Sequence, residues 1–223
     1  MPMYCINLPH SQYRRENIEL HNKTYGLDIK VFNGVYGAGL DISKLVQNGV
    51  LNSRVLNEAK HKIGDLGCYL SHCRVLQHIQ KTHQNNGIAL VLEDDFNIQE
   101  QEWKDFHNYI NNIPKEWQDK WDMLYIGYNH VHGRRLNKYW TTAETTTMTG
   151  MNSGAWAYII RISSIPKILK ASLPIKHTVD RDVMLKPLIG KQLKVLFTNR
   201  KIIKHNPIFG SERRTRNQKH FIS

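Results

Sequence analysis

Short apolar runs alternate with longer amphipathic stretches along most of the chain, which is typical of an α/β protein. No repeat or linker interrupts the pattern, so we expect a single domain. Runs of apolar residues that predict buried strands occupy residues 3–8, 30–33, 88–92, 121–128, 154–161 and 193–198.

Amphipathic helices are expected between these strands. The longest helical pattern covers residues 66–83 and leads directly into the strand at 88–92. Asp65 is its expected N-cap. A helix that runs into a fully apolar strand is typical of a parallel sheet, so we expect a mostly parallel sheet. Shorter helices are predicted to start after Ser11 and to occupy about 53–62, 101–112 and 163–171.

The chain has 223 residues, enough for one domain with a sizeable core, and a formal net charge of +12. Such a surplus implies an anionic partner, namely nucleic acid, a phosphate-bearing ligand or an anionic membrane surface. A generic solubilising charge is the simpler alternative. Lysine and arginine become more frequent from Lys186 to Lys219.

The cellular compartment of the protein is predicted from its hydrophobic segments and its cysteines. No apolar run approaches the length of a membrane span, and the first residues show no signal peptide. Cys5, Cys68 and Cys73 are few and have no CxxC spacing, so we expect neither a disulfide framework nor a zinc site. These features predict a cytoplasmic protein, with a basic surface suited to peripheral contact with an anionic membrane.

Three consecutive acids follow the apolar run at 88–92: Glu93, Asp94 and Asp95. Ligand sites in open α/β sheets lie beyond the carboxyl ends of strands. In extended backbone Glu93 and Asp95 would face one side together and Asp94 the other, so Asp94 is expected to face outward. Two carboxylates stay ionised together when a cation lies between them, and Mg²⁺ or Mn²⁺ bridged to phosphate fits this description. Alternatively, the acids cap the next segment or face solvent.

The motifs around these acids resemble glycosyltransferase family 25, which contains bacterial lipooligosaccharide galactosyltransferases and the collagen hydroxylysine galactosyltransferases of animals and giant viruses. The resemblance runs from about residue 3 to about residue 210. It rests on I-N-L followed by Arg14-Arg15 (6–15), G-D-L-G-C-Y-L-S-H (64–72), L-V-L-E-D-D (90–95), W-D-M-L-Y-I-G-Y (121–128) and G-A-W-A-Y-I-I (154–160).

The resemblance implies a GT-A-like fold with a Rossmann-type central sheet flanked by helices. A nucleotide-sugar half would cover about 1–128, an acceptor half about 129–210, and a basic tail 211–223. It also implies metal-dependent, inverting transfer of a sugar, usually galactose, from a UDP-sugar. The acceptor would be a glycan, a lipid-linked saccharide or hydroxylysine, and the cofactor Mn²⁺ or Mg²⁺.

Several site residues follow from the resemblance. Glu93-Asp94-Asp95 matches the D-x-D motif, so Glu93 and Asp95 are expected to hold the metal. Glu93 and Asp94 are expected to contact the nucleotide sugar. His205 follows the last predicted strand, where GT-A enzymes often place a metal-binding histidine. Ser71 and His72 lie on the helix that the family places beside the donor, although a buried histidine satisfied by a neighbour is the alternative for His72.

Two residues near the first strand are further candidates for donor binding. Asn7 lies at the end of that strand and Arg14 just beyond it, so both are predicted to contact the uridine or its phosphates. For Arg14 the alternative is a solvated helix face.

Direct inversion needs a general base for the acceptor hydroxyl, and Asp180 and Asp182 are the candidates. This pair could instead bind the acceptor, form a competing D-x-D motif or cap a helix that starts near Arg181.

Two other functions would explain the same composition. A basic nucleic-acid-binding protein or metal-dependent nuclease would combine positive charge with clustered acids, but it predicts basic residues interleaved with aromatic ones. Here the basic residues concentrate toward the C-terminus, so no nucleic-acid partner is expected. A catalytically inactive, glycosyltransferase-like scaffold is the other alternative, and the retained acids argue against it.

Overall fold

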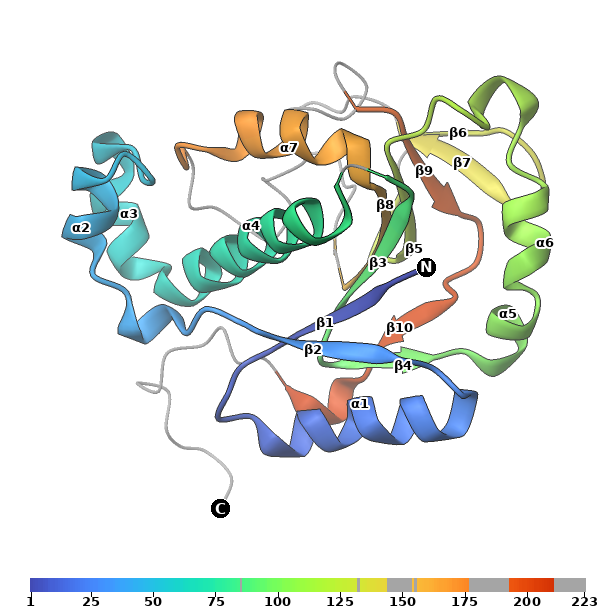
Figure 1. Cartoon of the computed structure of the whole chain (residues 1–223), viewed down its shortest axis with the longest axis horizontal. Coiled ribbons are helices and arrows are strands. Elements are labelled where there is room, and N and C mark those ends of the chain that lie inside the picture. The colour runs from blue at the N-terminus through green and yellow to red at the C-terminus, as the bar shows by residue number, and fades with distance from the viewer. Residues whose placement is uncertain (85, 132, 144–153, 155, 177–192, 211–223) are drawn as a thin grey trace.

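The computed structural model shows an α/β domain in which helices flank one mixed sheet of eight strands (Figure 1). The structure describes residues 1–84, 86–131, 133–143, 154, 156–176 and 193–210. The strand order is β2-β1-β3-β8-β5-β9-β7-β6. The strands are β1 (Met3–Asn7), β2 (Ile29–Asn33), β3 (Ile88–Glu93), β5 (Met123–Gly127), β6 (Gly133–Arg135), β7 (Trp140–Ala143), β8 (Ala157–Arg161) and β9 (Val195–Thr198).

The sheet is mixed, so the expectation of a mostly parallel sheet is wrong. Within the described residues, three strand pairings of this sheet are parallel and four are antiparallel. Strand β8 lies between β3 and β5 and runs against both. An apolar strand such as β3 is buried on both faces whichever way its neighbours run, so its composition could not reveal their direction.

Helices cover both faces of the sheet. Helices α4 and α7 pack on one face, where they meet Val91 of β3, while α1 and α6 pack on the other, where they meet Leu90 and Leu92. This alternation follows from the two-residue period of a strand. The helices are α1 (Gln12–Tyr25), α2 (Ile42–Gln47), α3 (Leu56–His61), α4 (Ile63–His83), α5 (Glu100–Lys104), α6 (Phe106–Asn111) and α7 (Ile165–Ser172).

The sequence predicted where the helices lie more accurately than where they begin and end. Helix α4 begins at Ile63, which places Asp65 inside the first turn rather than at the N-cap. The helix predicted over 101–112 is divided into α5 and α6. No helix among the described residues is long and apolar enough to cross a membrane.

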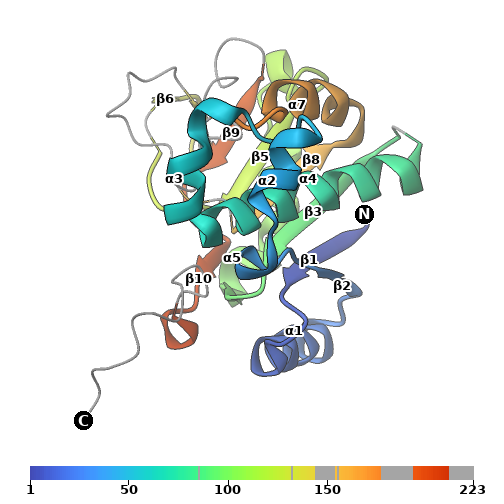
Figure 2. The ribbon, with the colours of Figure 1, turned by 90° about the vertical axis from the view of Figure 1, so that its left-hand side faces the viewer.

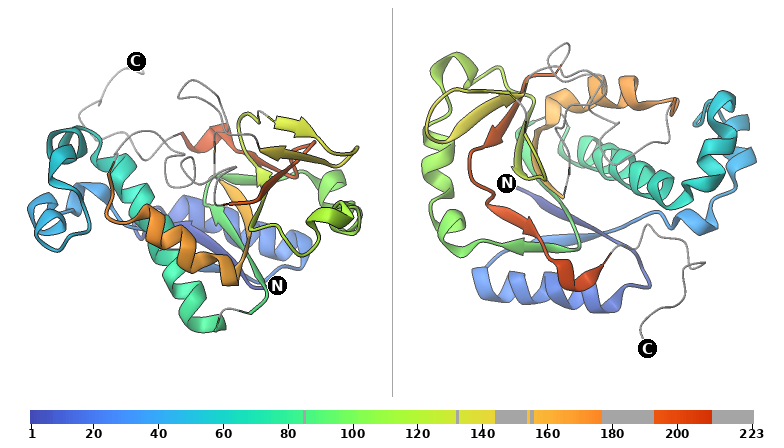
Figure 3. Two further views of the ribbon diagram at one scale, coloured as in Figure 1. Left: turned by 90° about the horizontal axis from the view of Figure 1, so that it is seen from above. Right: turned by 180° about the vertical axis from the view of Figure 1, so that it is seen from behind.

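A second, smaller sheet brings the end of the described chain back to the acidic motif. Strand β10 (Ile203–His205) runs antiparallel to β4 (Phe96–Ile98), with His205 opposite Phe96. Figure 3 shows β10 and the segment after it passing beside α1. Helices α2 and α3 lie at the opposite end of the molecule from α5 and α6 (Figure 1), at the end that faces the viewer in Figure 2. They pack on the start of α4 through a separate apolar cluster.

The start of α4 touches the backbone that follows β2. The Val35 amide donates a 2.8 Å hydrogen bond to the Ser71 hydroxyl, which itself donates to the Gly67 carbonyl at 2.7 Å. A Cβ atom on Gly67 would lie only 2.7 Å from the Val35 carbonyl oxygen and 2.7 Å from the Gly37 nitrogen. Glycine is therefore required at position 67 for this close approach.

Gly67→Ala should lower the free energy of unfolding by about 1–3 kcal/mol, because the backbone of 35–37 must move away. Without that clash, replacing a glycine inside a helix by alanine would stabilise the protein by about 0.5–1 kcal/mol. Gly39→Ala is the matched control, since its Cβ would lie 4.0 Å from the nearest heavy atom beyond its chain neighbours. Urea unfolding of the two variants measures the difference, and a stabilised Gly67→Ala protein would contradict the packing.

Candidate functional site

The carboxyl ends of β1 and β3 lie side by side, because the two strands are parallel neighbours with Ile6 opposite Glu93. Asn7 ends β1, and the chain turns through Asp94 and Asp95 between β3 and β4. Across this turn the backbone N–H of Asn206 donates to the backbone carbonyl of Asp95 at 2.6 Å. Residues from the start, middle and end of the described chain therefore meet at one edge of the sheet.

Asp94 is buried in this turn and paired with Arg14. Arg14 Nη1 lies 2.5 Å from Asp94 Oδ1, and Asn7 Nδ2 donates to Asp94 Oδ2 at 2.8 Å. Arg14 is only 4% exposed and Asp94 6%. Burial raises the pKa of Asp94, and the Arg14 guanidinium and Asn7 amide partly offset that rise.

The expectation that Asp94 faces outward is therefore wrong. The alternation of an extended strand ends at Glu93, the last residue of β3, and Asp94 already belongs to the turn.

Arg14 joins this turn to the end of the described chain. Its Nη2 donates to the carbonyl oxygens of Phe209 at 3.2 Å and Gly210 at 2.8 Å. Arg14 thereby links α1, the β3–β4 turn and the segment after β10. This excludes the alternative that Arg14 lies on a solvated helix face.

Asp95 and His205 form the second pair at this edge. Asp95 Oδ2 lies 3.2 Å from His205 Nε2 and 3.6 Å from Arg14 Nη1. The Asp95 side chain is 11% exposed, whereas the His205 side chain is 40% exposed. Two of the three predicted metal ligands are therefore adjacent, and their shared site is partly open to solvent.

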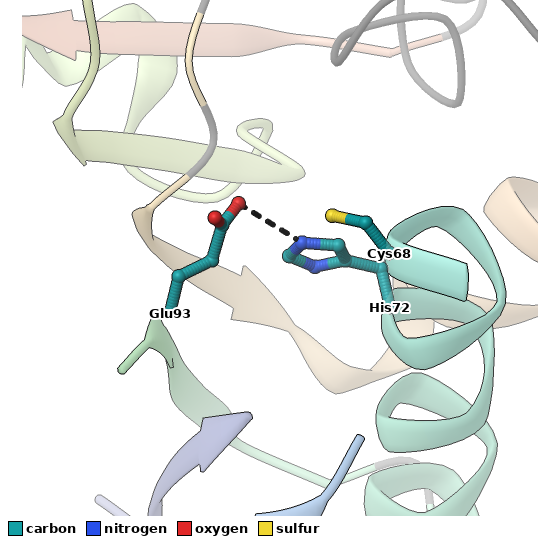
Figure 4. Close-up of side chains that lie close together, drawn as sticks. All are labelled: Cys68, His72 and Glu93. Carbon is teal, nitrogen blue, oxygen red and sulfur yellow. Dashed lines mark hydrogen bonds and ion pairs between the residues drawn. The ribbon is translucent and has the colours of Figure 1, made fainter. Parts of the chain in front are cut away.

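Glu93, the third predicted metal ligand, contacts α4. Its Oε1 lies 3.3 Å from His72 Nε2, and the Cys68 sulfur faces the same gap (Figure 4). The other ring nitrogen of His72, Nδ1, lies 3.0 Å from the Tyr158 hydroxyl oxygen. Burial by itself would lower the pKa of His72, but hydrogen bonds to Cys68 and then to Glu93 outweigh it and raise that pKa to about 9.

Of the remaining predicted site residues, the structure describes Ser71 but not the two candidate catalytic carboxylates. Ser71 is buried and its hydroxyl is bonded to Gly67 and Val35, so it connects α4 to the segment after β2; its contact with a donor stays a prediction. Asp180, Asp182 and the basic tail 211–223 lie outside the described residues.

Cys68 is the residue that the sequence reasoning missed. CxxC spacing does not indicate it, although Cys68 and His72 are four residues apart on a predicted helix. Residues with that spacing lie on one helix face, which was the available signal.

Arg14→Met should lower the free energy of unfolding by about 3–5 kcal/mol, because Asp94 would remain buried without its cation. Arg15→Met is the matched control. Arg15 contacts Asn7 Oδ1 at 3.3–3.4 Å and is only partly buried, so its loss should cost under about 1 kcal/mol. Guanidinium unfolding of both variants makes the comparison, and equal effects would show that the buried pair has no special weight.

Proteins with similar sequences support a common origin over most of the chain. Procollagen galactosyltransferase 1-B of Xenopus laevis is 23% identical over 173 residues, which cover 76% of this chain and 28% of that protein. A glycosyltransferase 25 family member of Aedes aegypti is 26% identical over 190 residues, covering 81% and 29%. Procollagen galactosyltransferase 1 of Danio rerio is 23% identical over 193 residues, covering 85% and 31%. The chain thus spans about three tenths of the length of these relatives.

Among solved structures, a glycosyltransferase involved in the glycosylation of the major capsid of PBCV-1 aligns with 86% of this chain and 69% of its own, at 8% identity and a TM-score of 0.38. That score is too low for the two folds to be equated. The sequence profile of glycosyltransferase family 25 (LPS biosynthesis protein) matches residues 1–184. The chain belongs to glycosyltransferase family 25.

Proposed function

We propose that the protein is a metal-dependent glycosyltransferase that moves galactose from UDP-galactose to an acceptor hydroxyl with inversion. The observation that carries the proposal is the adjacency of Asp95 and His205 at the carboxyl end of β3, in a chain of this family. Galactose as the transferred sugar rests on the procollagen galactosyltransferases among its relatives.

A divalent cation suits the Asp95–His205 pair. The 3.2 Å separation of Oδ2 and Nε2 lets a carboxylate and an imidazole bind the same ion. Mn²⁺ accepts a nitrogen ligand more readily than Mg²⁺, which prefers oxygen, so Mn²⁺ is the proposed cofactor. Because the His205 side chain is 40% exposed, diphosphate oxygens can reach the remaining coordination positions.

When bound, the ion would supply Lewis-acid stabilisation of the charge that develops on the leaving diphosphate. The protein's own residues prepare the site for that charge. Arg14 neutralises Asp94, so this buried carboxylate does not add to the negative charge around the diphosphate. Asn7 and Arg14 also fix the turn from which Asp95 projects.

Direct inversion requires no protein nucleophile but does need a base for the acceptor hydroxyl. Asp180 and Asp182 remain the proposed catalytic carboxylates.

The proposed acceptor is a hydroxyl on a phosphorylated, lipid-linked saccharide. The net charge of +12 suits an anionic acceptor or membrane face, and the family profile is described as LPS biosynthesis. A hydroxylysine peptide is the competing acceptor, suggested by the names of the relatives.

Release of UDP tests the proposal directly. The protein is incubated with UDP-galactose, UDP-glucose or UDP-N-acetylglucosamine, with Mn²⁺, Mg²⁺ or EDTA, and with a phosphorylated saccharide or a hydroxylysine peptide. We expect UDP-galactose with Mn²⁺ to give the highest rate, more than tenfold above EDTA. Metal-dependent UDP binding without turnover of any donor would indicate an inactive scaffold and overturn the enzymatic proposal.

Asp95→Asn should weaken Mn²⁺-dependent UDP binding by more than tenfold, because the substitution removes the ligand charge while keeping the side-chain shape. Asp119→Asn removes the same charge from an exposed position and should leave binding unchanged. Calorimetric titration of UDP with and without Mn²⁺ compares the two, and thermal unfolding checks that both variants are folded. Unchanged UDP binding by Asp95→Asn would place the metal elsewhere.

A further inference from the structure

We propose that Cys68, His72 and Glu93 form a second metal site, which takes a thiolate-binding transition metal ion such as Zn²⁺. This proposal departs from the expectation of no zinc site, which rested on the lack of CxxC spacing among the cysteines. The inference does not depend on the proposed activity, since it concerns different ligands and a different class of ion.

The fold brings the three ligands together from two elements. Cys68 and His72 are one helical turn apart on α4 and face the sheet, and Glu93 ends β3. Figure 4 shows the thiol, the imidazole and the carboxylate pointing into one gap between helix and strand. A sulfur, a nitrogen and an oxygen ligand are therefore present at a single place.

The distances are close to those that a tetrahedral ion requires. The three ligand atoms all lie within 4.8 Å of one another, and His72 Nε2 is 3.3 Å from Glu93 Oε1. Zinc bond lengths of about 2.0–2.3 Å place tetrahedral ligand atoms about 3.3–3.8 Å apart. Shifts of about one ångström, within reach of side-chain rotations, would close the site around the ion.

The ligand set also selects the class of ion. A thiolate, a neutral imidazole and a carboxylate carry two negative charges, which Zn²⁺ balances. A thiolate ligand disfavours Mg²⁺, Ca²⁺ and Mn²⁺, which prefer oxygen. This chemistry separates the site from the Asp95–His205 pair, which has no sulfur ligand.

Two neighbouring features favour binding. The buried Tyr158 hydroxyl lies 3.0 Å from His72 Nδ1, so it can accept a hydrogen bond from Nδ1–H, which makes Nε2 the ring nitrogen that binds a metal. Cys68 is partly exposed, and the Glu93 side chain is 18% exposed, so an ion has access from solvent. Three protein ligands leave the fourth position to water.

The ion would join α4 to the end of β3. Binding to the folded state alone should stabilise the protein by an amount that grows with the logarithm of the ion concentration, once that concentration exceeds the dissociation constant. Added Zn²⁺ should therefore raise the unfolding temperature, and Cys68→Ser should abolish that rise.

Titration with Co²⁺ tests the site with a spectroscopic signal. Metal-free, reduced protein should bind one equivalent of Co²⁺ with a thiolate-to-cobalt charge-transfer band in the near ultraviolet, and Zn²⁺ should remove the band. Cys68→Ser should lose the band, and Glu93→Gln should bind Co²⁺ at least tenfold more weakly. Cys73→Ala, which removes a buried thiol from the same helix, and Asp95→Asn should both retain the band.

Circular dichroism confirms that each variant is folded before titration. A second readout is alkylation of Cys68 by iodoacetamide, which Zn²⁺ should slow in the wild-type protein. The proposal is overturned if no charge-transfer band forms, if Cys68→Ser keeps it, or if Zn²⁺ leaves the alkylation of Cys68 unchanged.

Discussion

The buried ion pair between Arg14 and Asp94 is the interaction on which this end of the molecule depends. Burying a carboxylate is costly unless a cation and hydrogen bonds compensate, and Arg14 and Asn7 supply both. The same guanidinium reaches the carbonyl groups of Phe209 and Gly210. One side chain thus fixes the β3–β4 turn relative to α1 and to the segment that follows His205. Breaking the Arg14–Asp94 pair would therefore displace Asp95, although neither Arg14 nor Asp94 takes part in the proposed reaction.

Three consecutive acids can end an apolar strand because each lies beside a basic side chain. Asp94 faces Arg14, Asp95 faces His205, and Glu93 faces His72. The turn after β3 is what separates them, since a continued strand would have directed Glu93 and Asp95 to the same side. The acidic motif therefore offers two chemically distinct places, one with oxygen and nitrogen ligands and one that adds a thiol. The proposed Mn²⁺ and Zn²⁺ sites correspond to these two places.

The sequence predicted those parts of the fold that local pattern determines. Apolar residues are numerous and regularly spaced in strands β3 and β5 and in the long helix α4, so the sequence alone predicts these elements. Strands β4 and β10 have only three residues each, too few for a visible period, yet they bring His205 to Asp95. The direction of β8 and the burial of Arg14 depend on partners far along the chain, which no local window contains. The proximity of Cys68 to Glu93 could not be predicted for the same reason, although the four-residue spacing of Cys68 and His72 was visible in the sequence.

We propose that Asp95 and His205 hold the catalytic cation while Arg14 and Asp94 remain paired beside it. A crystal structure of the protein with Mn²⁺ and UDP tests this most directly, with anomalous scattering to locate the ion. We expect Mn²⁺ to be bound by Asp95, His205 and diphosphate oxygens, with the Arg14–Asp94 pair intact. Mn²⁺ bound away from Asp95, or a diphosphate that displaces Asp94 from Arg14, would contradict it.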